Sequence, residues 1–341
     1  MATQMLADTI NHIAQKGKGI LAADESTKTI GKRFATIDTE STAETRRQYR
    51  SLLATTEGLG EFVSGVILFE ETLEQKVDSG DTIPQAFHEQ GIMPGIKVDK
   101  GLKYLPTFPQ DTITQGLDDL ADRLTKYKEL GARFTKWRAV YAIQDGQGPS
   151  QTAVEANAES LARYAAICQA EGLVPIVEPE LLMDGDHDLE TCEVVSEHIL
   201  NAVFDRLHAH AVELEHIILK PNMVIPAKQC ADQSSPEAIA EATVRVLRRA
   251  VPSAVPTINF LSGGQSPEEA TINLNAMNVM GPHPWQLSFS YGRALQEPCL
   301  NTWHGSADNV AAAKKALYVR CQLNSAAVNA TYSKDQEPAR A

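Results

Sequence analysis

Lys220 is the residue whose sequence surroundings point most directly to covalent chemistry. It follows the apolar run 217–219 and precedes Pro221-Asn222. Burial and neighbouring cations both favour the neutral form of a lysine, and Lys136 and Arg138 are candidate neighbours. A neutral amine attacks carbonyl carbons to form a Schiff base, which withdraws electrons from the adjacent carbon–carbon bond. From spacing alone, a Schiff-base lysine and a plain ion pair with Glu178 or Glu180 are equally compatible with this pattern.

Three carboxylates are candidates for moving protons beside such a lysine. Glu178 and Glu180 flank Pro179, and alternate positions on a strand share one face. Two close carboxylates can differ in pKa, so one of them can exchange protons near neutral pH. Asp24, at the end of the first apolar run, is a third candidate for hydrogen bonding or general-base work. The simpler alternative is that one of the glutamates only neutralises a lysine.

Two late segments together predict a phosphate site. Residues 261–265 offer a hydroxyl and free backbone N–H groups just before a helix start at Pro267, where anions are favoured. Arg293 adds a guanidinium that can hold phosphate with two parallel hydrogen bonds. The Ser-Gly-Gly motif alone is also compatible with an ordinary turn. The predicted site consists of Ser262, Gly263, Gly264, Ser290, Gly292 and Arg293.

A second basic cluster follows the first apolar run. It contains Lys28, Lys32 and Arg33, with Arg46 and Arg47 further along. These residues could hold a second phosphate, but their spacing alone favours a solvated helix face.

No metal site is predicted. The oxygen-rich segment 184–188 and the pair His208 and His210 do not match a common zinc spacing such as H-E-x-x-H. An exposed loop and a helix end are the favoured interpretations.

The elements that must position these residues recur with a regular rhythm. Short β-rich runs alternate with helical patterns, which is typical of a closed (β/α)₈ TIM barrel. An open doubly wound sheet is the competitor, but it calls for G-x-G-x-x-G after the first strand, where this chain has Asp24-Glu25-Ser26-Thr27-Lys28. In a barrel the carboxyl ends of the strands meet at one mouth, so the candidate residues would converge there. The predicted strands are 19–24, 63–70, 93–99, 132–143, 174–180, 216–222, 256–263 and 286–293, and the main predicted helices are 115–130, 152–171, 187–210, 236–250, 267–277 and 307–327.

Local signals define helix starts and the domain. Segments 41–44 and 266–269 fit the capping box, and Ser235-Pro236 fits an N-cap followed by proline at the first helical position. No linker divides the chain, so we expect a single domain over 1–341. An N-terminal helix at 4–16 and a polar C-terminal tail at 331–341 are expected to decorate it.

Composition excludes several classes of function. The 341 residues carry a formal net charge of −13, which argues against a nucleic-acid-coating surface and against docking on anionic lipid. No apolar run is long enough to span a bilayer, and the N-terminus does not fit a secretory signal. Five scattered cysteines without a C-x-x-C pair indicate reduced thiols and a cytoplasmic location. An acidic chain can still bind an anion by concentrating its basic residues in one cleft.

Along nearly its whole length the chain resembles class I fructose-1,6-bisphosphate aldolase. The resemblance rests on long segments in a fixed order: GILAADEST at 19–27, VILFEETL at 66–73, GIKVDKG at 95–101, KWR at 136–138, VPIVEPE at 174–180, LKPNM at 219–223, FLSGGQ at 260–265 and FSYGRAL at 289–295.

The resemblance implies a metal-free, cofactor-free barrel enzyme of glycolysis and gluconeogenesis, usually a homotetramer. Such enzymes cleave fructose 1,6-bisphosphate reversibly into dihydroxyacetone phosphate and glyceraldehyde 3-phosphate. It implies that Lys220 forms the Schiff base and that Glu178 is the acid/base, assisted by Asp24, Lys136 and Glu180. The resemblance puts the phosphate next to the ketone on the site after the last two strands. The far phosphate would meet Arg33 and Lys32, with Ser26 and Arg46 as further candidates, and Lys97 is also an active-site lysine.

Departures from the family leave some points open. Animal and plant members end in a tyrosine that helps to protonate the enamine, whereas this sequence reaches Ala341 without one. Lys28 and Thr29 replace residues that are smaller or serine in many members. The preference between fructose 1,6-bisphosphate and fructose 1-phosphate and the enamine proton donor therefore stay unassigned. Separately, the sequence does not decide whether Glu178 or Asp24 is the base that takes the C4 hydroxyl proton. Two other hypotheses remain: a transaldolase-like or deoxyribose-phosphate lyase with one phosphate clamp, and a non-enzymatic binding scaffold.

Overall fold

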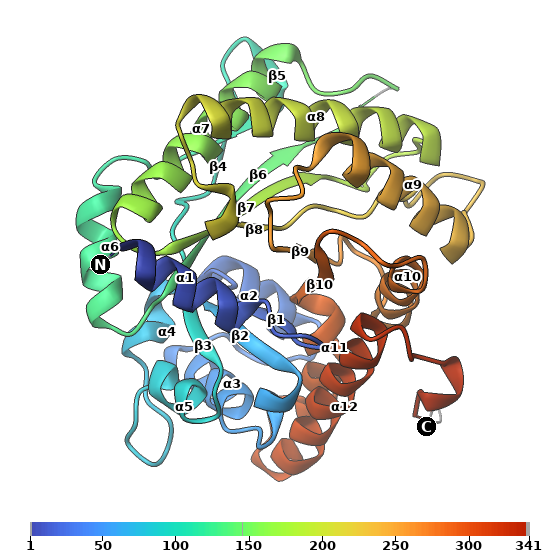
Figure 1. Cartoon of the computed structure of the whole chain (residues 1–341). Coiled ribbons are helices and arrows are strands. Elements are labelled where there is room, and N and C mark those ends of the chain that lie inside the picture. The colour runs from blue at the N-terminus through green and yellow to red at the C-terminus, as the bar shows by residue number, and fades with distance from the viewer. Residues whose placement is uncertain (1, 145, 339–341) are drawn as a thin grey trace.

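The computed structural model describes residues 2–144 and 146–338, and within them parallel strands close into a barrel (Figure 1). The order around the barrel is β1-β10-β9-β8-β7-β6-β3-β2, so the first and last strands pair and the open-sheet alternative is excluded. The strands are β1 Gly19–Ala23, β2 Val63–Leu68, β3 Met93–Lys97, β6 Phe134–Tyr141, β7 Val174–Leu181, β8 Ile218–Leu219, β9 Thr257–Phe260 and β10 Gln286–Tyr291.

Helices follow the strands and surround the barrel (Figure 1). All the predicted main helices are present. The 236–250 prediction is correct at both ends, and the others are shifted at one end or both. The helices are α1 Ala2–Ile13, α2 Thr27–Ala35, α3 Ala43–Ala54, α4 Glu70–Glu74, α5 Ile83–Glu89, α6 Leu120–Glu129, α7 Gln151–Ala170, α8 Leu189–Ala209, α9 Pro236–Ala250, α10 Pro267–Val279, α11 Arg293–Trp303 and α12 Val310–Val328.

Several expected boundaries are wrong for local reasons. The helix expected at 115–130 begins only at Leu120, because residues 102–114 form an antiparallel hairpin, β4 Leu102–Leu105 with β5 Phe108–Thr114. The N-terminal helix ends at Ile13 rather than at 16, and Gly17 follows in the left-handed region at φ +79°. The eighth strand stops at Tyr291, and Arg293 starts a helix that sequence patterns did not predict.

The caps show one error and two successes. Thr42, rather than Ser41, caps α3 and forms the capping box with Thr45, while Glu44 instead pairs with Arg47. The box at Ser266 and Glu269 and the cap at Ser235 are as expected. Of the tail expected at 331–341, residues 339–341 lie outside the described part of the chain.

Two hydrophobic clusters hold the barrel together. The smaller one lies inside the barrel near its amino end, where Ile20, Phe134, Ile176 and Ile218 meet the apolar face of α1. There Phe134 leaves no room for a side chain on its neighbour, because a β-carbon on Gly95 would lie 2.3 Å from its ring. The interior is thus closely packed at the amino end.

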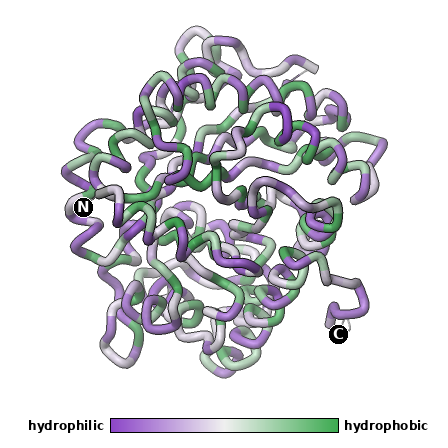
Figure 2. The backbone as a smooth tube through the Cα atoms, viewed as in Figure 1, coloured by the Kyte–Doolittle hydropathy of each residue, from purple (hydrophilic) through white to green (hydrophobic). Residues whose placement is uncertain are grey.

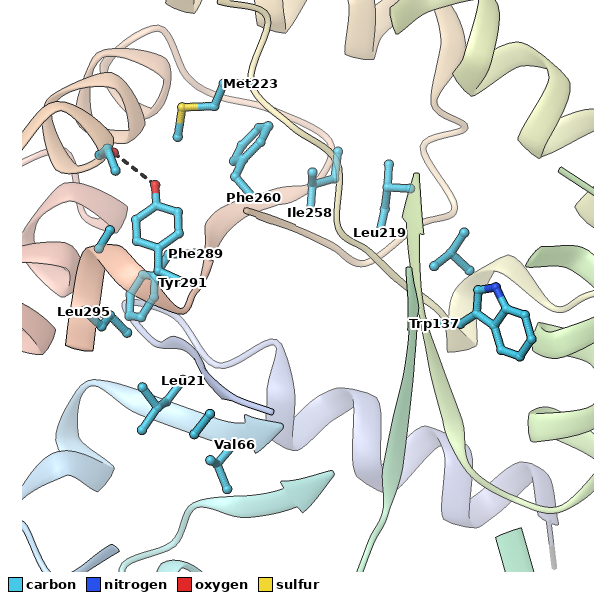
Figure 3. Packing of buried hydrophobic residues seen from close by; sticks show 14 of the residues in the cluster. Leu21, Val66, Trp137, Leu219, Met223, Ile258, Phe260, Phe289, Tyr291 and Leu295 are labelled. Carbon is cyan, nitrogen blue, oxygen red and sulfur yellow. Dashed lines mark hydrogen bonds between the residues drawn. The ribbon is translucent and has the colours of Figure 1, made fainter. Parts of the chain in front are cut away.

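The larger cluster lies between the strands and the helices. Figure 3 shows its outward-facing residues, including Leu21, Trp137, Leu219 and Tyr291. The Tyr291 hydroxyl donates to the Ala270 carbonyl of α10 at 2.9 Å, which ties strand to helix (dashed line, Figure 3). In Figure 2 the hydrophobic segments lie mainly toward the middle of the molecule and the hydrophilic ones toward its outer turns.

Candidate active site

Strand alternation aims the predicted charges into the barrel. Successive side chains on a strand point to opposite faces, so every second residue shares a direction. On β6, Phe134 belongs to the interior cluster and Trp137 to the outer one, so Lys136 and Arg138 continue the inward row. The same parity runs from Ile20 and Ala22 to Asp24 after β1, from Val174 and Ile176 to Glu178 and Glu180 on β7, and from Ile218 to Lys220 after β8.

Four of these inward groups form a chain of alternating charge. The Lys220 Nζ atom lies 3.0 Å from Glu178 Oε1, and the Lys136 Nζ atom lies 3.3 Å from Glu178 Oε2. Lys136 also lies 2.7 Å from Asp24 Oδ2. The side chains of Lys220, Lys136 and Glu178 are at most 5% exposed, so water screens these contacts little. Asp24 and Glu178 both form an ion pair with Lys136, and of these two carboxylates Glu178 also pairs with Lys220.

The charge state of two groups follows from this geometry. Burial by itself would raise the pKa of Asp24, but Lys136, Lys220 and Lys97 outweigh it and lower that pKa to about 2. Burial would lower the pKa of Lys136, but the carboxylates of Asp24, Glu178 and Asp99 raise it well above its usual value. At neutral pH Asp24 is therefore an anion and Lys136 a cation beside Lys220.

Two further ion pairs border this centre. Arg138 is bound to Glu180, and Lys97 lies 2.7 Å from Asp99 Oδ1. Burial opposes the charge on Arg138, but Glu180 and Glu178 raise its pKa above the usual value. Glu180 therefore forms its ion pair with Arg138, whereas Lys220 pairs with Glu178.

A cavity of about 230 Å³ opens above the charged chain and gathers nearly all of the predicted residues. It is open to solvent at the carboxyl ends of the strands, which is where the chemistry of such barrels takes place. Its lining includes Asp24, Ser26, Arg33, Lys97, Lys136, Arg138, Glu178, Glu180, Lys220, Ser262, Gly263, Ser290, Gly292 and Arg293.

The predicted phosphate site lies at one side of this cavity. Residues 262–265 form a turn closed by a 2.9 Å hydrogen bond from Gln265 N to Ser262 O. Gly263 and Gly264 have φ of +54° and +85°, which a side chain would strain. Within the described residues their N–H groups have no hydrogen-bond acceptor, and the buried Ser290 hydroxyl has no partner either. Unsatisfied donors around a turn suit an anion. Ser262, Gly263, Gly264, Ser290, Gly292 and Arg293 are called the phosphate cup below.

The second predicted basic cluster is divided by the fold. Arg33 and Ser26 line the main cavity, and a β-carbon on Gly292 would lie 3.5 Å from Arg33 Nη2. Lys32 is exposed and lines an adjoining cavity of about 430 Å³, to which Arg33 and Arg293 also contribute. Arg33 and Arg293 thus stand between the two cavities.

Arg46 is a correction to the sequence-based site. Its guanidinium is held by Glu71 at 2.6 and 2.9 Å and by the Ser41 carbonyl at 3.1 Å, and it does not line either cavity. The reason is that α3 turns this face toward α4, which carries Glu71. Arg50, also on α3, binds the same carboxylate. Its positive charge is therefore satisfied within the fold.

Two residues of the site were missed by sequence reasoning. Glu25 accepts hydrogen bonds from Arg33 and from Gln296 of α11, the latter at 2.7 Å. Gln296 also donates to the Ala22 carbonyl at 2.7 Å and accepts from Tyr49. The position of Glu25 beside Asp24 was the available signal, whereas Gln296 carried none because α11 was not predicted. In the described part of the chain no three His, Cys, Asp or Glu residues cluster as a metal site would require.

Comparisons with known proteins point to one family over nearly the whole chain. A family described as fructose-bisphosphate aldolase class-I matches residues 5–341. Fructose-bisphosphate aldolase 2 of Plasmodium berghei is 52% identical over 330 residues, which are 96% of this chain and 89% of that protein. The cytosolic fructose-bisphosphate aldolase 4 of Arabidopsis thaliana is 53% identical, with coverage of 96% and 83%. A probable fructose-bisphosphate aldolase class 1 of Xanthomonas campestris is 50% identical, with coverage of 95% and 97%.

A solved structure supports the same grouping. Fructose-bisphosphate aldolase from Plasmodium falciparum, in complex with TRAP and a small-molecule inhibitor, superposes with a TM-score of 0.96 at 51% identity. The alignment covers 97% of this chain and 96% of that one. Within the described residues, no helix combines the length and the apolar character that a membrane crossing requires.

Proposed function

The chain belongs to the class-I fructose-bisphosphate aldolase family, and we propose how its own residues carry out that reaction. The enzyme cleaves fructose 1,6-bisphosphate reversibly into dihydroxyacetone phosphate and glyceraldehyde 3-phosphate in glycolysis, through a lysine Schiff base. The observation that carries the residue assignment is the pair of contacts made by Glu178, one to Lys220 and one to Lys136.

Lys220 is the nucleophile. As the neutral amine it attacks the C2 ketone to form a carbinolamine. Glu178, 3.0 Å away, carries one proton from the attacking nitrogen to the former carbonyl oxygen, which completes the carbinolamine. Glu178, protonated again from solvent, then donates a second proton to this hydroxyl, which leaves as water, and the nitrogen keeps its remaining proton in the iminium. Lys136, 3.3 Å from the other oxygen of Glu178, holds this carboxylate beside Lys220.

The carbon–carbon bond then breaks toward the iminium. The C4 hydroxyl loses its proton, the C3–C4 electron pair moves to the iminium to give an enamine, and glyceraldehyde 3-phosphate leaves. We assign Glu178 as the base that takes this proton. Glu178 is the carboxylate in contact with Lys220, whereas the lysine neighbours of Asp24 lower its pKa to about 2, which makes Asp24 a weak base. Asp24 instead keeps Lys136 charged and in place.

Two anion sites fix the substrate above Lys220. The phosphate cup holds the phosphate next to the ketone, with N–H groups of Gly263 and Gly264, the Ser290 hydroxyl and the Arg293 guanidinium. Arg33, helped by Ser26 and by Lys32 at the rim, holds the far phosphate. Lys97 and Arg138 donate to hydroxyl groups between them. Holding both ends places the scissile bond over the amine, which can contribute several kcal/mol to catalysis.

The test of this assignment is reductive trapping. The protein is incubated with fructose 1,6-bisphosphate and borohydride in EDTA, and the adduct is mapped by mass spectrometry. A reduced triose- or hexose-phosphate adduct on Lys220, with cleavage unaffected by the chelator, is the expected result. An adduct on another lysine would overturn the assignment, and cleavage lost in EDTA would contradict the metal-free mechanism.

Two properties of the whole protein are proposed alongside. A homotetramer in the cytoplasm, active in gluconeogenesis as well as glycolysis, is supported by family membership and by a cytosolic relative at 53% identity. Sedimentation velocity at micromolar concentration tests the assembly, for which a mass of one 37.1 kDa chain would be contradictory.

A further inference from the structure

We propose that Lys228 is a second cation of the phosphate cup, beside Arg293, and determines how tightly the phosphate next to the ketone is bound. This inference rests on the proposed function and adds a phosphate-binding residue that neither spacing nor the expected site included. It depends on a convergence of Lys228 with Arg293 over Gly264.

Lys228 and Arg293 both lie close to the α-carbon side of Gly264, as a β-carbon built on this glycine shows. A β-carbon placed on this glycine would lie 2.9 Å from Lys228 Cε, 3.0 Å from Met183 Sδ and 3.2 Å from Arg293 Nη2. The Lys228 side chain and the Arg293 guanidinium therefore approach the same backbone point. An anion seated on the N–H groups of the turn would meet both cations.

The cup has unsatisfied groups that call for such an anion. Ser290 is 1% exposed, and its hydroxyl has no hydrogen-bond partner within the described chain. Gly263 and Gly264 are likewise without acceptors for their N–H groups in the residues described. The turn itself is rigid, because the Gln265 side chain donates to the Ser262 carbonyl at 3.0 Å and accepts from Asn273 at 2.7 Å.

The backbone of Lys228 is held firmly in this position. Three consecutive N–H groups, of Ala227, Lys228 and Gln229, donate to the carbonyls of His187, Met183 and Gly185 at 2.8, 2.9 and 3.0 Å. The loop after β8 is thus bonded to the loop after β7 beside the cup. This pairing delivers the lysine to the cup at a small entropic cost on binding.

The ammonium itself has only a weak competing partner. Lys228 Nζ donates to Asp184 Oδ1 at 3.1 Å, and the two side chains are 45% and 69% exposed. An exposed pair of this kind contributes little free energy, so a phosphate dianion can replace the carboxylate. Asp184 then acts as a resting partner that competes with substrate. Because the whole chain carries a net charge of −13, local cations at the cup matter for capturing an anionic sugar.

The test compares Lys228→Met, Lys228→Arg and Asp184→Asn in the full-length enzyme, with fructose 1,6-bisphosphate and fructose 1-phosphate as substrates. Losing one charge-assisted contact should raise KM about tenfold for both sugars, since both carry the phosphate next to the ketone. The value of kcat should stay close to that of the parent. Arginine should restore KM, and Asp184→Asn should lower it.

Lys126→Met is the matched control. Lys126 forms an exposed ion pair with Glu74 at 3.3 Å on α6 and α4, so its loss changes the net charge equally without touching the cup. A KM for Lys228→Met within twofold of the control would overturn the proposal. So would an Asp184→Asn variant whose KM rises as much, because the ion pair and not the lysine would then support the cup. The Schiff-base adduct on Lys220 is followed in parallel, so a failure of the reaction itself is distinguished from a failure of this inference.

Discussion

Glu178 lies between two lysines, with one carboxylate oxygen 3.0 Å from Lys220 Nζ and the other 3.3 Å from Lys136 Nζ. All three side chains are almost fully buried. A single proton on Glu178 changes the charge balance of both lysines at once. This arrangement supports the proposal that one carboxyl serves the proton transfers around Lys220.

Replacing Lys220 by methionine should abolish the reaction. Without the amine no imine forms, and we expect cleavage activity to fall by at least about 1,000-fold. The borohydride adduct should also disappear. Retained cleavage in Lys220→Met, measured with a coupled assay for dihydroxyacetone phosphate, would favour a non-covalent mechanism. The fold should survive, because Glu178 keeps Lys136 as its partner.

Replacing Glu178 by glutamine should lower kcat by about 100-fold to 10,000-fold, the usual range for loss of a general acid/base. KM should change much less, since Glu178 forms its ion pairs with Lys220 and Lys136 and not with the residues proposed to bind phosphate. Asp24→Asn gives the comparison: a fall in kcat larger than that of Glu178→Gln would identify Asp24 as the base.

Asp24 should make folding stability depend on acid pH. Its pKa is lowered from 3.8 to about 2 in the folded chain, so the folded state binds this proton more weakly than the unfolded state does. The stabilisation is therefore complete above pH 3.8 and is lost as pH falls toward 2. The shift corresponds to about 2 kcal/mol. Urea unfolding of Asp24→Asn between pH 7 and pH 2 should show a flatter dependence on pH than the parent; parallel curves would contradict this.

Replacing Arg33 by alanine should separate the two sugar substrates. Arg33 is proposed to bind only the far phosphate, so KM for fructose 1,6-bisphosphate should rise about tenfold or more while KM for fructose 1-phosphate stays the same. Steady-state kinetics with both sugars measures this. Equal effects on the two sugars would argue for a single clamp, as in a transaldolase-like lyase.

The polar tail should contribute to stability through one buried pair. Arg320 Nη1 donates to Glu337 at 2.6 and 2.8 Å, and the Tyr332 hydroxyl donates to the same carboxylate at 2.8 Å. Glu337→Gln weakens these charge-assisted bonds and should lower the unfolding free energy by about 2 kcal/mol. Tyr332→Phe removes one bond and should cost about 1 kcal/mol. Chemical denaturation measures both, and no loss in either variant would mean that the tail is not docked in solution.

The sequence by itself determined the barrel and most of its inward charges. Strand alternation is a local property: once Ile20, Ile176 and Ile218 face inward, Asp24, Glu178 and Lys220 must follow two or four residues later. The apolar runs and the turn residues around Gly263 are equally local. For that reason the carboxyl-end residues could be recognised before any contact was known.

Only the tertiary structure decided which charges share a partner. Arg46 looked equivalent to Arg33 in the sequence, yet α3 turns it toward Glu71, while Arg33 meets Glu25 at the cavity. Lys228 did not enter the sequence-based site, because it comes to Gly264 only where the loops after β7 and β8 are hydrogen-bonded together. These outcomes depend on distances between segments far apart in the chain. Such distances follow from barrel closure and helix packing, which residue types and spacing do not encode locally.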